Sequence, residues 1–181
     1  MTRRHIHYEA AFEDYLRSRG QPYVAVDENR KAIFAGNRVK SFDFLVYAAS
    51  GQTWLVDIKG RQFPYDHDGR KRYWENWITR DDLDGLTQWQ ETFGEGFVGM
   101  LVFAYHVTEL GKRLPTHHLH LFRDQTYAFM CVTLDEYKDA CRHRSEKWET
   151  VTVATKDFKA IAKPIQSLTG NNGLRASSAG L

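Results

Sequence analysis

Two aspartates and a lysine lie inside an otherwise apolar sequence, SFDFLVYAASGQTWLVDIKGR, at residues 41–61. The apolar spacing predicts a β-hairpin whose turn is centred on Ser50. Because side chains alternate between the two faces of a strand, Asp57 and Lys59 share a face. The turn places Asp43 opposite Asp57, where two like charges destabilise a sheet unless a cation lies between them.

This combination of side chains suits the metal-assisted hydrolysis of a phosphodiester. Mg²⁺ prefers oxygen ligands and is commonly held by one or two carboxylates, waters and substrate phosphate. Asp43 and Asp57 supply two carboxylates, and the carbonyl of Ile58 supplies a third oxygen. Lys59 projects on the same side, where it can orient or help to deprotonate a water and stabilise charge on a phosphoryl group.

A structural interpretation competes with the catalytic one. An Asp-x-Lys spacing by itself is most often a solvent-facing pair on a half-exposed strand. Asp43, at the matching phase of the preceding strand, weakens that interpretation, and an acidic helix upstream weakens it further. Glu9 flanks the apolar face of this helix, although an acid near a helix N-terminus is also favourable on electrostatic grounds alone.

In these residues the chain resembles the PD-(D/E)XK nuclease superfamily, which has the restriction-endonuclease-like fold. The matching pattern is an acid on a first helix, Glu9 in HYEAAFEDYL, followed by Asp43 in SFDF and by Asp57 and Lys59 in WLVDIKGR. A helix and a strand follow, so that the resemblance extends over residues 5–107. The order of elements is similar to that of Holliday-junction resolvases.

The order of elements predicts an α/β fold with a mixed sheet, with extra C-terminal strands and a helix. The resemblance implies a three-layer core in which helices flank a central four-stranded mixed β-sheet. It implies Mg²⁺ as the cofactor, with Mn²⁺ able to substitute. Asp43, Asp57 and the Ile58 carbonyl would be its ligands, and Glu9 would join the metal shell directly or through water. Lys59 would be the catalytic lysine.

Gln88 is a further catalytic candidate on the same resemblance. Some members, the RecB-like exonucleases among them, carry a glutamine on the helix that follows the lysine strand, and LTQWQETF offers Gln88 there. An ordinary polar position on a helix surface explains this residue as well. The chain departs from the family pattern at Phe42, where a proline is common, and at Asp57, where glutamate is the commoner acid.

A basic and aromatic segment follows Lys59 and is expected to be a long irregular loop, a kind of segment that tends to be functional or mobile. Basic groups bind phosphates and aromatic rings stack on unpaired bases, which predicts a nucleic-acid contact here. A loop that is anchored by its own aromatic residues is an equal alternative. The predicted nucleic-acid-binding residues are Arg61, Arg70, Lys71, Arg72, Tyr73 and Trp74.

The remaining elements must position the site. Apolar spacing predicts helices at 7–19, from Asp81 or Asp82 to about Phe93, at 134–144 and at 156–165, and strands at 23–28, 41–48, 53–60, 97–107, 119–122, 126–134 and 148–154. The strand at 97–107 is the most apolar and is expected at the centre of the sheet. Residues 1–168 are predicted to form one domain, and 169–181 a disordered tail.

Composition sets the outer limits. The 181 residues are 42% hydrophobic, which is enough for a core, and the net charge of +2 means that any basic surface must be local. Two cysteines cannot make a disulfide framework. No run approaches the length of a membrane span, so a cytoplasmic protein without membrane contact is expected.

The sequence therefore predicts a metal-dependent nuclease that hydrolyses phosphodiester bonds in nucleic acid, with DNA as the favoured partner. The alternative is a non-catalytic nucleic-acid-binding module on the same fold. A third class, a small-molecule or protein-interaction domain with a chance motif, would place Asp43 and Lys59 in a surface salt bridge. Many relatives in such a family work as dimers, so a homodimer stays open.

Overall fold

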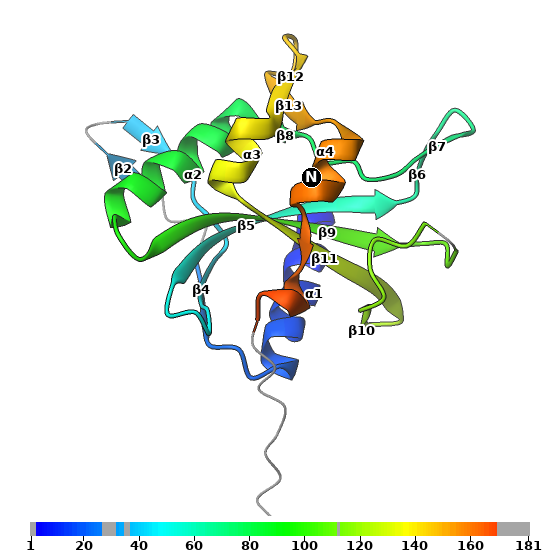
Figure 1. The fold of residues 1–181 in the computed structure, drawn as a ribbon, viewed down its shortest axis with the longest axis horizontal. Coiled ribbons are helices and arrows are strands. Elements are labelled where there is room, and N and C mark those ends of the chain that lie inside the picture. Colours follow the sequence, from blue (N-terminus) through cyan, green and yellow to red (C-terminus); the bar gives the residue numbers. More distant parts are fainter. Residues whose placement is uncertain (1–2, 27–31, 35–36, 112, 170–181) are drawn as a thin grey trace, which may run out of the picture.

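A seven-stranded mixed sheet forms the centre of the molecule (Figure 1). The computed structural model describes residues 3–26, 32–34, 37–111 and 113–169. The strand order is β1-β4-β5-β9-β11-β10, with β14 paired to β11. These strands are β1 (Tyr23–Ala25), β4 (Phe44–Tyr47), β5 (Thr53–Phe63), β9 (Phe97–Val107), β10 (His120–Phe122), β11 (Gln125–Thr133) and β14 (Lys163–Pro164).

The sheet is mixed because its two longest strands, β5 and β9, run parallel while the other pairs are antiparallel. Parallel neighbours need a crossover connection, which here includes the helix α2 (Arg80–Phe93). Pairing of β5 with β9 continues for the whole length of both strands, from Thr53 opposite Phe97 to Phe63 opposite Val107. This pair makes a rigid centre from which the residues of the candidate site project.

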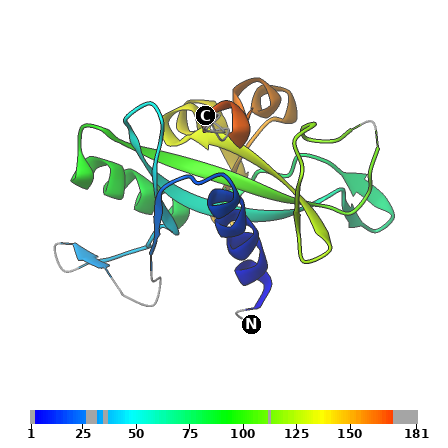
Figure 2. The ribbon, with the colours of Figure 1, turned by 90° about the horizontal axis from the view of Figure 1, so that it is seen from below.

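Helices cover both faces of the sheet and create two separate cores. The helix α1 (Arg3–Ser18) crosses one face and buries Phe12 and Leu16 against Val56 and Ile58. Figure 2, viewed from that side, shows α1 lying in front of the sheet. Helices α2, α3 (Leu134–Ala140) and α4 (Thr155–Ile161) contribute to the core of the other face, and a short 3₁₀ helix follows at Ile165–Ser167.

Three smaller sheets decorate this centre. One is a hairpin of β2 (Ala32–Phe34) and β3 (Asn37–Val39), and another is a hairpin of β6 (Tyr65–His67) and β7 (Arg70–Arg72). The third has the order β12-β13-β8, with β8 (Ile78–Thr79), β12 (Cys141–Ser145) and β13 (Thr150–Val153). It joins the C-terminal part of the chain to the segment that leads into α2.

The predicted fold class, an α/β fold with a central mixed sheet and helices on both faces, is confirmed. The sheet has seven strands, whereas the resemblance implied four. The strand predicted at 97–107 matches β9 residue for residue, and the hairpin register centred on Ser50 is confirmed by Tyr47 opposite Thr53. In the part of the chain that the structure describes, no helix has the length and apolar character to cross a membrane.

Three local predictions were wrong. The segment after Lys59 is not an irregular loop, because β5 continues to Phe63 and β6, β7 and β8 follow. The helix predicted at 134–144 ends at Ala140, since the next residues pair with β13 and become strand β12. A regular strand at 41–48 would place Phe42 and Phe44 on one face, but the chain bends at Asp43 and the two rings enter opposite cores.

The predicted tail cannot be compared in full, because residues 170–181 lie outside the described residues. Its first residue, Thr169, is buried, and its hydroxyl oxygen lies 3.3 Å from the Tyr15 hydroxyl oxygen on α1. The last two residues of the strand predicted at 23–28 also lie outside the described residues.

Gly60 lets α1 approach the β5 strand directly beside the candidate site. A Cβ atom added to Gly60 would lie 2.6 Å from Cγ of the Tyr8 ring, so the ring packs on the bare backbone. We expect Gly60→Ala to lower the free energy of unfolding by about 1–3 kcal/mol, because the ring must move away. Urea unfolding measures this change. Gly111→Ala is the control, since nothing lies within 4 Å of an added Cβ there; an equal effect of the two substitutions would contradict the packing.

Candidate active site

The start of α2 supplies an acid that reaches β5. Thr79 is the N-cap, and its hydroxyl accepts a hydrogen bond from the Asp82 amide at 3.1 Å. The Asp82 carboxylate accepts one from the Thr79 amide at 2.9 Å in return. This capping box satisfies two amides at the helix start and holds the Asp82 side chain in one orientation. Asp82 was expected only as a possible cap, and the N-cap itself is three residues earlier.

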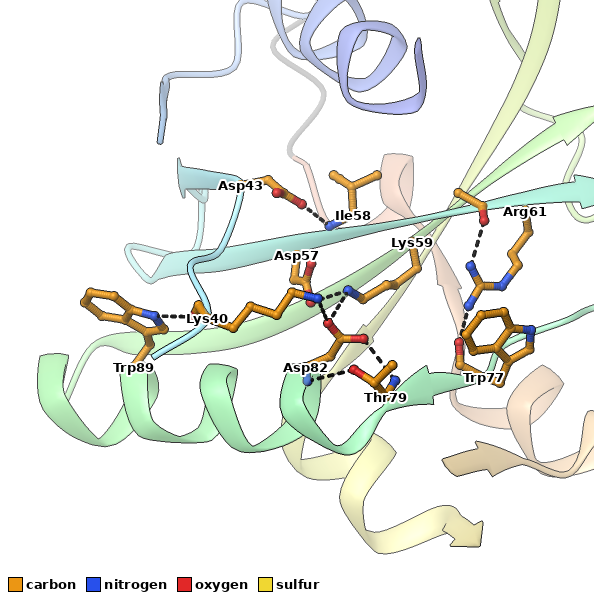
Figure 3. Close-up of polar contacts among 11 residues, drawn as sticks. Lys40, Asp43, Asp57, Ile58, Lys59, Arg61, Trp77, Thr79, Asp82 and Trp89 are labelled. Carbon is orange, nitrogen blue, oxygen red and sulfur yellow. Dashed lines mark hydrogen bonds and ion pairs between the residues drawn. The ribbon is translucent and has the colours of Figure 1, made fainter. Parts of the chain in front are cut away.

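Lys59 lies between two buried carboxylates (Figure 3). Its ammonium is 2.8 Å from Asp57 Oδ2 and 3.0 Å from Asp82 Oδ1. The side chain of Lys59 is only 11% exposed, and those of Asp57 and Asp82 are 8% and 5% exposed. The half-exposed ammonium of Lys40 makes a second ion pair with Asp82 from the solvent side. The cluster therefore joins two carboxylates and two ammonium groups across β5, α2 and the segment before β4.

The two carboxylates differ in their electrostatics. Burial raises the pKa of Asp57, and the attraction of Lys59 offsets this only in part. Burial acts on Asp82 in the same direction, but Lys59 and Lys40 outweigh it and hold the pKa of Asp82 well below its usual range. Burial would lower the pKa of Lys59, but Asp57 and Asp82 raise it above its ordinary value. Lys59 is therefore a protonated cation at neutral pH.

Asp43 lies at the bend where β4 begins, and its side chain is turned to the backbone of β5. Its amide donates to the carbonyl of Val56 at 2.8 Å, and its carboxylate accepts from the amide of Ile58 at 2.5 Å. It is buried and lies on the opposite side of the β5 ribbon from Asp82 (Figure 3). Asp43 and Asp57 thus flank one peptide bond, that between Asp57 and Ile58, instead of facing each other as a regular cross-strand pair.

The Ile58 carbonyl lies at the same edge of β5. In a β-strand the N–H and C=O of one residue point toward the same neighbouring strand. The Ile58 amide points toward Asp43, so its carbonyl points there too, just past the first paired residue of β4, Phe44. The edge of β5 therefore presents a main-chain oxygen beside the Asp43 carboxylate.

The other two predicted catalytic residues are Glu9 on α1 and Gln88 on α2. Glu9 is half-buried on α1, next to Tyr8, whose ring packs on Gly60. The start of α1 therefore crosses β5 one residue after Lys59. Gln88 is exposed on α2, and the structure does not bring it to the cluster. The inward acid of this helix is Asp82, which the Thr-x-x-Asp pattern at 79–82 could have indicated as a cap but not as a partner of Lys59.

The predicted nucleic-acid-binding segment divides into inward and outward residues. Arg61 is buried, donates to the carbonyls of Gly60 (2.7 Å) and Trp77, and lies 4.3 Å from the centre of the Trp77 ring. Burial lowers the pKa of Arg61. The expectation of Arg61 as a surface phosphate contact was wrong, because β5 continues past Gly60 and alternation turns its side chain to the interior, as it does that of Lys59.

Tyr73 and Trp74 also pack inward, with ring centres 5.3 and 5.7 Å from that of Phe63. Both side chains are half-buried and anchor the segment, as the alternative interpretation expected, and their contact with nucleic acid stays a prediction. The remaining three residues, Arg70, Lys71 and Arg72, form the exposed strand β7. Lys71 makes an ion pair with Glu109.

The donor atoms near Lys59 suit a hard cation. Among the residues that the structure describes, no group of three or more His, Cys, Asp or Glu side chains could hold a metal ion. Asp43, Asp57 and the Ile58 carbonyl offer two carboxylates and one main-chain oxygen around one peptide bond, which is the oxygen-only set that Mg²⁺ uses together with waters. A cation there would also offset the burial that raises the pKa of Asp57.

Comparison with known proteins finds a similarity in fold. No protein-family model matches the chain, and no curated protein matches it. Among solved structures it is similar to Hjc, a Holliday junction resolvase from the archaeal hyperthermophile Archaeoglobus fulgidus, with a TM-score of 0.51 and 10% identity. The match covers 90% of this chain and 97% of the resolvase. At this identity the likeness shows a shared fold.

The contacts of Lys59 can also be compared with those expected for the third class, a domain that carries the motif by chance. That class expected Asp43 and Lys59 in a surface salt bridge, whereas Lys59 is buried and contacts Asp57 and Asp82. A buried lysine that bridges two acids from different elements is not a solvent-facing pair. The geometry therefore favours a built site over a chance motif.

Asp82 should be the main electrostatic support of the cluster. We expect Asp82→Ala to lower the free energy of unfolding by about 2–4 kcal/mol at neutral pH, because it removes a helix cap and leaves Lys59 and Lys40 without this partner. Urea unfolding measures the change. Asp81→Ala is the matched control, because Asp81 is exposed in the same helical turn and should cost less than about 1 kcal/mol.

The loss of stability caused by Asp82→Ala should also depend on pH. Because the folded-state pKa of Asp82 lies below its unfolded value, its stabilising contribution is complete above the unfolded pKa, about 3.9, and is lost as the pH falls through the folded pKa. The difference between wild type and Asp82→Ala should therefore narrow in acid. A difference that is the same at acidic and neutral pH would contradict the ion pairs.

Proposed function

We propose that this protein is a metal-dependent nuclease that hydrolyses phosphodiester bonds in nucleic acid, with DNA as the favoured substrate. The observation that carries the proposal is the buried Asp57–Lys59–Asp82 cluster beside the Asp43 carboxylate, at the bend where β4 begins. The fold shared with a Holliday junction resolvase supports the same class of substrate. The exposed arginines of β7, Arg70 and Arg72, offer positive charge for phosphates.

The residues divide the work as follows. Asp43, Asp57 and the Ile58 carbonyl would hold Mg²⁺, and Glu9 would join them from α1, directly or through water. When bound, this ion would polarise the phosphate and lower the pKa of a water. The continuous pairing of β5 with β9 fixes the backbone of Asp57 and Ile58, the two ligand residues on β5.

Lys59 would act as a fixed positive charge rather than as a base. Its ion pairs with Asp57 and Asp82 keep it protonated at neutral pH, because they raise its pKa. A protonated ammonium can donate to a phosphate oxygen or to the oxygen of a water, and it stabilises negative charge that develops in the transition state. Asp82 would be a positioning residue, since it holds the ammonium at 3.0 Å from the start of α2.

The alternative is a non-catalytic nucleic-acid-binding module, and one observation favours it. A buried lysine that is already neutralised by two carboxylates also has a purely structural role, because it joins β5 to the start of α2. In that case the substitutions below would change stability without removing any activity, and binding of nucleic acid would be the whole function.

A nuclease assay separates the two. We would incubate wild type, Asp57→Ala and Lys59→Ala with Mg²⁺ or Mn²⁺ and supercoiled plasmid, single strands, flaps and four-way junctions. Wild type should cleave at least one substrate, and both variants should lose roughly 100-fold or more of the rate, because Asp57 would hold the metal and Lys59 would stabilise charge on the reacting phosphate. Asp81→Ala should keep the activity.

Three results would contradict the nuclease proposal. Equal cleavage by wild type and both variants would indicate a contaminant or another site. Cleavage that persists in excess EDTA would contradict the metal requirement. Binding of these substrates without cleavage of any of them would favour the non-catalytic module. Circular dichroism of each variant establishes that a lost activity is not a lost fold.

A further inference from the structure

The C-terminal hairpin β12–β13 projects from the molecule next to the start of α2 (Figure 1). It is tied there by pairing of β13 with β8 and by a hydrogen bond from the Arg80 amide to the Glu149 carbonyl at 2.8 Å. Arg80 is the first residue of α2, the helix that carries Asp82. The hairpin is therefore fixed relative to the candidate active site.

A cleft of about 300 Å³ separates this hairpin from the segment at 72–77. Arg72 and Arg144 line it from opposite sides together with Trp77, Thr152 and Thr155, and Glu75 is the one acid among the lining residues. Both arginines are exposed, and within the described ranges neither forms an ion pair with a carboxylate. The cleft thus holds two arginines that are available for an anion.

Trp77, which lines the cleft, is in contact with Arg61 of strand β5. The Arg144 guanidinium lies 5.2 Å from the centre of the Trp77 ring, and Arg61 lies 4.3 Å from the centre of the same ring. Arg61 follows Lys59 by two residues, a rise of about 7 Å along β5. Trp77 therefore lies between the exposed Arg144 of the cleft and the buried Arg61 of the strand that carries Lys59.

Further basic and aromatic groups lie on the hairpin and on α4, outside the lining of the cleft. Lys159 of α4 is exposed and lies 5.2 Å from the centre of the Trp74 ring, which also lines the cleft. Arg142 shares a face of the hairpin with Thr152, its cross-strand partner, and is exposed. At the tip of the hairpin Trp148 is 68% exposed, and the Lys147 ammonium lies 5.3 Å from the centre of its ring. The tip of the hairpin therefore presents a large exposed ring beside a cation.

We propose that this cleft binds the sugar–phosphate backbone of a single nucleic-acid strand, with Arg72 and Arg144 on its phosphates and Trp148 stacked on one of its unpaired bases. The proposal rests on the proposed nuclease function and specifies its substrate as one with an unpaired segment. Charge complementarity supplies the affinity, because two unpaired arginines face a polyanion. The volume suits one nucleotide of a single strand rather than the full width of a duplex, and an exposed indole stacks only on a base that is not already paired.

The test is a binding titration of the full chain in EDTA, where metal-dependent cleavage cannot occur. The probe is a short labelled oligonucleotide, compared with a blunt duplex of the same sequence. We expect Arg72→Ala/Arg144→Ala to weaken single-strand binding roughly tenfold and to reduce the slope of log K against log salt by about 1.4, or about 0.7 for each lost phosphate contact. Trp148→Ala should weaken single-strand binding by roughly fivefold or more and leave duplex binding unchanged.

Arg17→Ala/Arg123→Ala is the matched control, because it removes the same charge from two exposed arginines on α1 and in the turn before β11. It should leave the affinity within twofold of wild type. An equal loss of affinity in the control would mean that only the overall charge matters, and it would overturn the proposal that the cleft binds the strand. Tighter binding of the duplex, with no effect of Trp148→Ala, would overturn the single-strand assignment, and no binding of either probe by wild type would overturn the proposal as a whole.

These outcomes are distinguishable from failure of the nuclease proposal. Asp57→Ala should lose cleavage and keep single-strand binding, because it lies outside the cleft. If wild type cleaves but the cleft variants bind as wild type does, only the cleft is wrong. If the cleft variants lose binding but wild type never cleaves, the cleft stands and the nuclease proposal fails.

Discussion

The ion pairs of Lys59 with Asp57 and Asp82 are the interaction on which the candidate site depends. A lysine with an 11% exposed side chain is costly to bury unless opposite charge surrounds it, and here one acid comes from its own strand and one from the start of α2. The cap at Thr79 fixes Asp82, and Asp82 in turn fixes Lys59. The position where α2 begins is thus set by the same contacts that hold the lysine protonated and in place.

Residues of the candidate site lie on both faces of strand β5 and along one of its edges. Asp57, Lys59 and Arg61 project to the side of α2, while Val56 and Ile58 pack under α1. Gly60 allows the Tyr8 ring to lie on the backbone, which brings α1 and Glu9 close to the same stretch of strand. At the edge of β5, where regular pairing with β4 stops, the Asp43 carboxylate accepts a hydrogen bond from the Ile58 amide. One strand can serve all of these purposes because β9 pairs with it along its full length.

Much of this could be predicted from the sequence, and the parts that could not share a physical cause. Alternation within a strand is local, so the shared face of Asp57 and Lys59 and the whole of β9 followed from the residue pattern. The role of Asp82 depends on where the first turn of α2 packs, which no local pattern reports. Arg61 looked like a surface residue by type, but a carbonyl of Trp77 and its ring enclose the guanidinium. Residues 141–144 carry helix-compatible residues, and only their pairing with β13 makes them a strand.

The central claim is that the acids around the Asp57–Ile58 peptide form a metal centre, and crystals grown with Mn²⁺ test it most directly. The account predicts an anomalous difference peak about 2.1 Å from carboxylate oxygens of both Asp43 and Asp57, with the Ile58 carbonyl in the same coordination shell. Crystals of Asp57→Ala should lose the peak. A protein saturated with Mn²⁺ that shows no peak there, or one bound only at other residues, would contradict the account and leave Lys59 with a structural role.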